Sequence, residues 1–311
     1  MSVRVATRAS SLARTQSQMI ADQLAALMGA EVELVEVSTQ GDVDRSTPLA
    51  QLGGTGVFVA AVREAVLRGE ADIAVHSLKD LPTAPAAGLT LAAVPRRADF
   101  RDALIARDGL SMTTLPTGAR VGTGSPRRVA QLLEMRPDLD VVDVRGNVDT
   151  RIRLVHDGLV DAVVLAMAGL ERLGRLDEVT QILDLDLMIP APGQGALAVE
   201  CRSVKDDVRL HDALAKLDHA ESRLAVTAER ELLAALEAGC SAPVGAHAAV
   251  SDVDGDLVTH LTGFLGSGVR NFRKSVTGES ADPVLLGRKL AEQLLTALES
   301  GTSRPVKGGA A

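Results

Sequence analysis

Four arginines lie close together in a chain that is acidic overall. The formal net charge is −8, yet Arg127, Arg128, Arg145 and Arg151 all lie within residues 121–151, near glycines and small hydroxyl residues. A guanidinium group is a planar fork that binds a carboxylate or phosphate through two hydrogen bonds at once. This positive charge is local, whereas a surface that binds nucleic acid is broadly basic. The pattern predicts a pocket for a small molecule with several anionic groups.

The first two of these arginines belong to the segment VGTGSPRR. Ser125 can cap a following helix, and Pro126 suits the first helical turn, where a missing N–H costs nothing. The helix N-terminus would then offer unpaired amides and a partial positive charge, which Arg127 and Arg128 reinforce. The alternative is an ordinary strand-to-helix connection with two solvated arginines. Neither a dinucleotide-binding fingerprint nor a P-loop matches this segment.

The other two belong to RGNVDTR, where Arg145 ends an expected strand and Arg151 lies in the next helix. Ligands of open α/β sheets bind at the carboxyl ends of the strands, so both can face the same crevice as Arg127. The alternative is a set of surface ion pairs with Asp143 or Asp149. Several arginines at successive strand ends favour the pocket.

The segment HSLKDLP brings His76, Ser77, Lys79 and Asp80 to one turn after an apolar strand. A carboxylate beside a lysine at the end of a strand can stabilise a cationic intermediate or transfer a proton. The alternative is a Lys–Asp pair on the surface, which this segment taken alone would favour.

The two cysteines are too few for a disulfide scaffold, and no CxxC motif or histidine cluster indicates a metal site. Cys240 follows a long helical pattern and stands between Gly239 and Ser241. A loop thiol is a candidate nucleophile or attachment point, and the alternative is a small buried residue. Cys201, in an apolar strand, is interpreted as buried. The spacing leaves both possibilities open for Cys240.

Strand-like and helix-like segments alternate from the N-terminus, which is typical of open, mostly parallel α/β sheets. A first helix is expected from Ser10 or Ser11 to Gly29, and another after the glycine-rich 53–56, with Phe58 on its apolar face. Three strands and a last helix are expected beyond Cys240, and the tail 300–311 is expected to be disordered. Strands are predicted at 3–7, 32–39, 71–78, 89–95, 102–106, 120–124, 140–145, 161–166 and 197–201, and the middle helices at 126–136, 148–157, 169–174, 205–217 and 219–238.

Composition narrows the function classes. Apolar residues make up 46% of the chain but aromatic residues only 1%, so the cores must be built from Leu, Val, Ile and Ala, and stacking platforms for bases are scarce. No apolar run has the length of a membrane span, and the first residues lack the apolar region of a signal peptide. We therefore expect a cytoplasmic protein that binds neither nucleic acid nor membrane.

Taken together, these motifs resemble the porphobilinogen deaminase (hydroxymethylbilane synthase) family over nearly the whole chain. The resemblance rests on VATRASSLA, GDV, GGTGVF, ADIAVHSLKDLP, VGTGSPRR, RGNVDTR, LAMAGLERLG, PAPGQGALAVECR and LEAGCSAPVG, which occur in this order. It implies a transferase that condenses four porphobilinogen molecules head to tail into hydroxymethylbilane and releases ammonia. It also implies a dipyrromethane cofactor, made from two substrate units and joined by a thioether to Cys240.

The resemblance assigns a role to each matching position. Asp80 would be the catalytic carboxylate that binds pyrrole N–H groups and stabilises the azafulvene cation left when ammonia departs. An arginine-lined cleft suits this chemistry, because each porphobilinogen carries an acetate and a propionate. The positions that would contact cofactor or substrate are Arg8, Ser10, Gln16, Phe58, Ser77, Lys79, Thr123, Ser125, Arg127, Arg128, Arg145, Arg151 and Arg172.

The implied fold class is α/β, with two lobes like those of type II periplasmic binding proteins and a smaller α+β C-terminal domain. The expected domains are 1–97 with 196–216, 98–195, and 217–311, and the family implies a monomer. The sequence departs from the family pattern at Gln40, Thr55 and Pro126. The alternatives are a two-lobed binding protein for an anionic small molecule, and a relic that binds tetrapyrroles without turnover.

Overall fold

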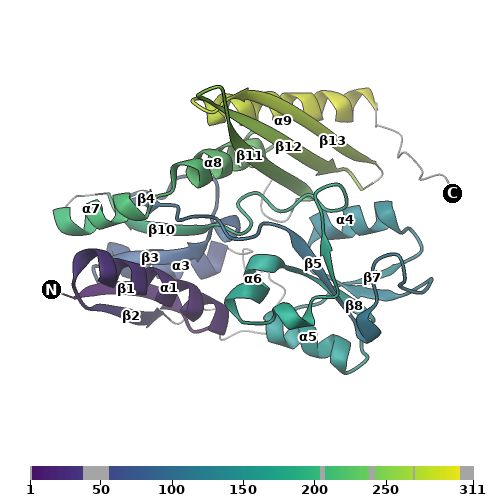
Figure 1. Cartoon of the computed structure of the whole chain (residues 1–311), viewed down its shortest axis with the longest axis horizontal. Coiled ribbons are helices and arrows are strands. Elements are labelled where there is room, and N and C mark those ends of the chain that lie inside the picture. Colours follow the sequence, from purple (N-terminus) through teal and green to yellow (C-terminus); the bar gives the residue numbers. More distant parts are fainter. Residues whose placement is uncertain (1, 38–55, 204–206, 238–241, 269, 302–311) are drawn as a thin grey trace.

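The computed structural model describes residues 2–37, 56–203, 207–237, 242–268 and 270–301, the side chains of 56–58 excepted. Within these ranges the strands form two five-stranded sheets and one three-stranded sheet. Figure 1 shows the two larger sheets side by side, with the third above them. None of the helices in these ranges has the length and apolar character needed to cross a lipid bilayer. The interpretations of Gln40, Thr55, Cys240 and the tail beyond residue 301 concern residues outside this part.

The first sheet has the strand order β2-β1-β3-β10-β4, and β10 runs antiparallel to both of its neighbours. Helices α1 and α7 cover one face, where Val5 and Val75 lie in a core with Leu24 and Leu214, and α3 covers the other. The elements are β1 (Val3–Arg8), α1 (Ser11–Met28), β2 (Val32–Val37), α3 (Gly56–Leu67), β3 (Ile73–Ser77), β4 (Leu89–Ala93), β10 (Leu197–Arg202) and α7 (Val208–Leu217).

The second sheet repeats this plan with the order β7-β6-β8-β5-β9, and here β5 is the antiparallel strand. Leu132 of α4 packs on one face, while Ile152 of α5 and Leu170 of α6 pack on the other. The elements are β5 (Asp102–Ala106), β6 (Arg120–Gly122), α4 (Pro126–Met135), β7 (Asp140–Val142), α5 (Val148–His156), β8 (Ala162–Ala166), α6 (Met167–Arg172) and β9 (Gln181–Leu183).

The third sheet is an antiparallel meander in which β12 pairs with both β11 and β13. Helices α8 and α9 cover one face of it, and Leu232 and Leu290 lie in the core between them. The two helices pack closely at Gly287, where an added Cβ would lie 2.7 Å from the Ala228 carbonyl oxygen. The elements are α8 (Ala220–Ala235), β11 (Val244–Val253), β12 (Asp256–Gly266), β13 (Asn271–Glu279) and α9 (Pro283–Ser300).

These sheets confirm the predicted fold class of two α/β lobes with a smaller α+β C-terminal domain. Local signals also hold, since Ser10 caps α1 by accepting a hydrogen bond from the Ala13 amide, and Gly29 ends the helix in the left-handed conformation. Ser125 occupies the N-cap of α4, but its side chain makes no capping hydrogen bond. The strands predicted at 120–124 and 140–145 end earlier, at residues 122 and 142. Strand β9 was not predicted.

Candidate functional site

Most of the candidate residues lie at the carboxyl ends of the parallel strands in the first two sheets. A single 3-10 turn, η1 (Leu78–Asp80), continues from β3, and α4 and α6 begin after β6 and β8. The two lobes contact each other here, because an added Cβ at Gly169 of α6 would lie 3.8 Å from the side chain of Leu12 in α1. Figure 1 shows α1 and α6 adjacent at the centre of the molecule. The site is therefore built by both lobes.

Lys79 and Asp80 lie together on η1, and both are partly buried. Burial lowers the pKa of Lys79 to about 8, Asp80 partly opposes that shift, and the charge of Arg128 adds to it. Arg128 belongs to α4 of the second lobe. Its effect on the pKa of Lys79 indicates that the Lys79 ammonium lies near the arginines of that lobe. Both residues remain partly exposed, so a Lys–Asp pair at the surface of the turn is compatible with a position beside these arginines.

Arg127 and Arg128 are buried around Asp102, the first residue of β5. The Arg127 guanidinium lies 2.8 Å from one carboxylate oxygen of Asp102, and the Arg128 guanidinium lies 2.7 Å from the other. Arg127 also donates to the Ile189 carbonyl and Arg128 to the Val164 carbonyl. The alternative of two solvated arginines is wrong, because these residues are only 3% and 5% exposed.

Electrostatics make this cluster a fixed positive centre. Burial alone would raise the pKa of Asp102, but the charges and hydrogen bonds of Arg127 and Arg128 hold it well below its usual range. Burial lowers the pKa of Arg127, although an arginine stays charged at neutral pH. Two guanidinium charges against one carboxylate leave a positive excess beside the first turn of α4. This excess can attract the carboxylates of a ligand.

Arg145 and Arg151 lie at the next strand end, but they differ in environment. Arg145 is half-exposed and pairs with Asp143 at 3.3 Å, which is one of the surface pairs considered for this segment. Asp149 pairs with Arg175 instead. Arg151 donates to the Gly146 carbonyl, and burial, followed by the charge of Arg128, lowers the pKa of Arg151. Arg151 is the less exposed of the two, and its guanidinium lies within electrostatic range of Arg128.

Arg172 ends α6 and faces the segment that returns to the first lobe. One of its terminal nitrogens donates to the Gly195 carbonyl at 2.7 Å. Its Nε atom is buried without a hydrogen-bond partner in the described part of the chain, and burial lowers the pKa of Arg172. A buried donor without a partner is costly, so this atom is suited to an anionic ligand.

Two polar candidates of the first lobe, Gln16 and Ser77, lie next to the same turn. Gln16 and Ser77 are hydrogen-bonded to each other, with distances of 3.0 and 3.2 Å between their side-chain atoms. Ser10 caps α1, and Arg8 ends β1. In the second lobe Thr123 is buried and accepts from the Ser125 amide. The structure gives the backbone of Phe58, at the start of α3, and Cys240 lies outside the described residues.

Sequence reasoning missed Asp102 and three residues that join the lobes to the C-terminal domain. Glu229 of α8 is fully buried, pairs with Arg97 at 2.6 Å and accepts from the Gly193 amide. Arg230 of α8 donates to main-chain carbonyls around η1. A charged residue needs a partner of opposite charge if it is buried. That requirement could have marked these residues as paired, but it does not identify the partner.

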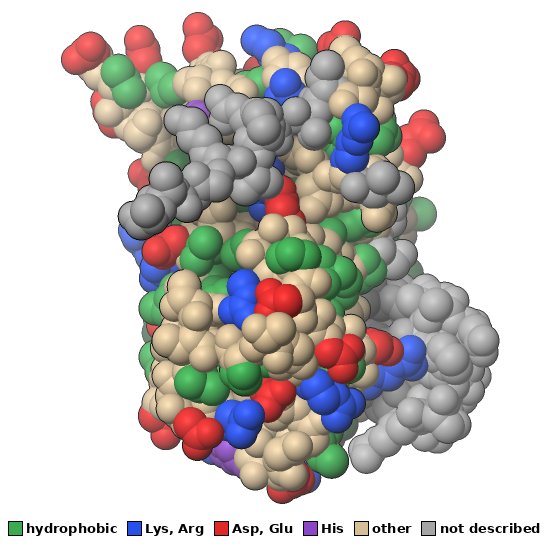
Figure 2. Space-filling view, turned by 90° about the vertical axis from the view of Figure 1, so that its right-hand side faces the viewer, with side chains coloured by type: hydrophobic (Ala, Val, Ile, Leu, Met, Phe, Trp, Pro, Cys, Tyr) green, Lys and Arg blue, Asp and Glu red, His purple; other side chains and the backbone are tan. Residues whose placement is uncertain are grey.

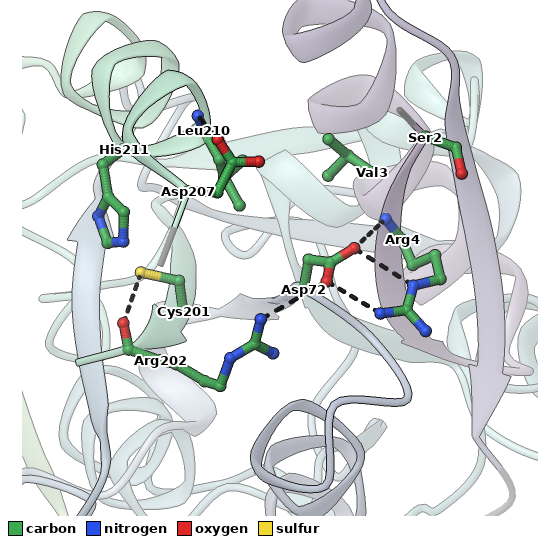
Figure 3. Close-up of a pocket in the computed structure, with 9 residues that line it drawn as sticks. All are labelled: Ser2, Val3, Arg4, Asp72, Cys201, Arg202, Asp207, Leu210 and His211. Atoms are coloured by element: carbon green, nitrogen blue, oxygen red, sulfur yellow. Dashed lines mark hydrogen bonds and ion pairs between the residues drawn. The ribbon is translucent and has the colours of Figure 1, made fainter. Parts of the chain in front are cut away.

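A separate cavity lies away from these residues. It has a volume of about 270 Å³ and lies at the amino ends of β1 and β3, beside Arg4, Asp72, Cys201 and His211 (Figure 3). Arg4 is already satisfied there, since its guanidinium and its amide both bind Asp72. The cavity is thus separated from η1 by the length of the sheet.

The surface in Figure 2 shows acidic and basic side chains mixed with apolar ones. On this face the positive charge is not gathered into a broad basic surface. The cationic group beside η1 is instead enclosed by protein, with Arg127 and Arg128 among its buried members. Such enclosure strengthens electrostatic attraction to a small anionic ligand.

Comparisons with known proteins agree with one another. Residues 3–210 match the family model described as porphobilinogen deaminase, dipyromethane cofactor binding domain, and residues 223–296 match that of its C-terminal domain. Porphobilinogen deaminase 1 of Streptomyces coelicolor is 54% identical and covers 94% of each chain. Porphobilinogen deaminase of Thermobifida fusca is 52% identical, covering 99% of this chain and 97% of its own. Among solved structures, the periplasmic VFT2 domain of BvgS from Bordetella pertussis is 17% identical to this chain, with a TM-score of 0.41. The match covers 70% of this chain and 86% of that domain. This similarity carries no information about function.

Proposed function

This chain belongs to the porphobilinogen deaminase family, and we propose that Asp80, in the turn after β3, is its catalytic carboxylate. The reaction is the head-to-tail condensation of four porphobilinogen molecules into hydroxymethylbilane with release of ammonia. When ammonia leaves, the substrate becomes cationic, and a carboxylate can stabilise that charge and accept a pyrrole N–H. Asp80 lies beside cations that would hold the carboxylates of the substrate.

The observation that carries this proposal is the convergence of cations from both lobes. The charge of Arg128 in the second lobe lowers the pKa of Lys79 in the first lobe, and it also lowers the pKa of Arg151. Porphobilinogen carries two carboxylates, which such a cluster would bind while leaving the pyrrole near Asp80. The residues proposed to contact substrate or cofactor are Arg8, Ser10, Gln16, Phe58, Ser77, Lys79, Thr123, Ser125, Arg127, Arg128, Arg145, Arg151 and Arg172.

The residues present also fit the dipyrromethane of this family. Its carboxylates would be bound by cationic donors, and the buried, unpartnered Nε atom of Arg172 is such a donor. Arg151 and Arg172 would hold the group through its carboxylates, and we propose Cys240 as its point of attachment. When bound, the group supplies the primer to which substrate units are added. The protein contributes fixed charges, orientation and partial exclusion of water.

Three further features belong to the proposal. The domains would be 1–97 with 196–216, 98–195, and 217–311, which is supported by the return of β10 to the first sheet. The enzyme would act as a monomer, as the family resemblance implies. It would act in the cytoplasm, as the sequence led us to expect.

The alternative of a binding protein for an anionic small molecule shares the two-lobed fold, and fold alone does not determine function. The family match favours the enzyme over that alternative.

The test is the substitution Asp80→Ala. We expect turnover to be nearly abolished in a protein that stays folded, because Asp80 lies on a partly exposed turn and removing it opens no core cavity. Hydroxymethylbilane formation measures the activity, and circular dichroism measures the fold. Normal turnover in Asp80→Ala would overturn the assigned role.

A further inference from the structure

The turn that carries Lys79 and Asp80 is held from outside its own lobe. Arg230 of α8, in the C-terminal domain, donates to the Leu81 carbonyl at 3.0 Å and to the Pro82 carbonyl at 2.7 Å. A longer hydrogen bond of 3.4 Å reaches the Leu78 carbonyl. These acceptors lie on both sides of Asp80 along the chain, so one guanidinium group spans the whole turn.

Apolar packing supports the same contact. Leu78 and Leu81 are almost fully buried and share a core cluster with Val226, which lies one turn before Arg230 on α8. On the other side, the Leu78 amide donates to the Ala196 carbonyl at 3.0 Å. Gly193 packs so closely that an added Cβ would lie 3.1 Å from the Leu78 side chain. The turn is thus fixed between α8 and the segment that connects the lobes.

The residue before Arg230 fixes α8 itself. Glu229 accepts hydrogen bonds from the Gly193 amide at 2.7 Å and the Ala248 amide at 2.8 Å, besides its ion pair with Arg97. These contacts join α8 to β11 and to both connections between the lobes. Glu229 and Arg230, which are adjacent on α8, therefore bind the lobe connections and the turn of Asp80, respectively, to the same helix.

We propose that Arg230 is a positioning residue for catalysis, which sets the place of Asp80 through the backbone of the turn without touching substrate. The proposal rests on the assignment of Asp80 as the catalytic carboxylate. Hydrogen bonds from a charged donor are stronger than neutral ones, and Arg offers several donors in a rigid fork. A displacement of about 1 Å in a catalytic group can reduce a rate by roughly 100-fold.

Arg223 provides a matched control on the same helix. Its guanidinium also donates to main-chain carbonyls of the first lobe, those of Leu91 and Ala92, at 3.3 and 3.1 Å. Those carbonyls belong to β4, away from η1. Arg223→Gln therefore weakens the docking of α8 on the first lobe as Arg230→Gln does, but it leaves the turn of Asp80 in place.

The experiment compares Arg230→Gln, Arg230→Lys and Arg223→Gln, each carrying the cofactor as verified by intact mass. We expect Arg230→Gln to lower kcat by about 10- to 100-fold with little change in KM, and Arg230→Lys to restore part of the loss. Hydrogen exchange at the Leu81 amide, which donates to the Leu78 carbonyl, should become faster in Arg230→Gln and stay unchanged in Arg223→Gln. If Arg230→Gln fails to fold, Arg230→Lys is judged by the same two measurements, with a smaller expected loss.

Unchanged kcat and exchange in the Arg230 variants would overturn the proposal. An equal loss in Arg223→Gln would also overturn it, because the effect would then be one of domain docking. The Asp80→Ala variant separates the two hypotheses. Normal turnover there refutes the role of Asp80, whereas an inactive Asp80→Ala beside a fully active Arg230→Gln refutes the role of Arg230 alone.

Discussion

Replacing Asp102 by asparagine should destabilise the protein strongly, because two buried cations depend on this carboxylate. Asp102 is fully buried and accepts from Arg127 at 2.8 Å, from Arg128 at 2.7 and 3.1 Å, and from Gln194 at 3.0 Å. An amide of the same shape keeps the volume but removes the charge. Breaking a buried ion pair on one side costs about 3–5 kcal/mol, and we expect a loss of that size.

The assay is equilibrium unfolding in urea followed by circular dichroism, with Glu231→Gln as the control. Glu231 pairs with Arg288 at 2.7 Å, but the Arg288 side chain is 65% exposed. Such a surface pair contributes about 0–1 kcal/mol. A loss below about 1 kcal/mol for Asp102→Asn, no larger than that of the control, would refute the reasoning that this carboxylate holds the arginines in place.

Three further predictions concern charge. Because the Lys79 pKa is about 8, we expect kcat/KM to fall as pH rises through that value and the ammonium is lost, and Lys79→Arg to remove this limb of the profile. His247 is buried beside Phe100, and burial lowers its pKa to about 4, with Glu229 opposing and Arg97 and His260 adding to the shift. As the pH falls, His247 is therefore protonated in the unfolded chain before it is protonated in the folded protein. The free energy of unfolding should fall by roughly 3 kcal/mol between about pH 6.5 and 4. In His247→Gln the free energy of unfolding should change less between these two pH values. Arg145→Ala removes a half-exposed cation, so it should slow chain growth or cofactor assembly without loss of stability. The rates are measured by quenching the reaction at intervals and determining the mass of the protein. Rates equal to those of the unmodified protein would contradict the role of Arg145.

Much of the fold could be predicted from the sequence, because periodicity and caps are local. Ser10 and Gly29 bound α1 as expected, and the three strands expected beyond Cys240 are present as β11, β12 and β13. The antiparallel direction of β5 and β10 could not be predicted, since a strand buried on both faces has the same apolar composition in either direction. Strand β9 has only three residues, too few for a periodic pattern.

The candidate site was predictable in residue type more than in geometry. Motif spacing brought Lys79 and the arginines to the ends of strands, where the structure has them. The spacing could not show that Arg127 and Arg128 turn inward, because their partner Asp102 lies 25 and 26 residues earlier in the chain. The hydrogen bonds from Arg230 join residues about 150 positions apart, a separation that local patterns do not report.

The most direct test of the account is the intact mass of the purified, denatured protein, with Cys240→Ser as the control. We predict a covalent excess equal to two porphobilinogens less two ammonias, which is absent from the variant. A bare mass calls for incubation with porphobilinogen, after which the excess should appear on Cys240. If no mass appears on Cys240 after incubation, or if the excess persists in Cys240→Ser, the proposed attachment of the cofactor is contradicted.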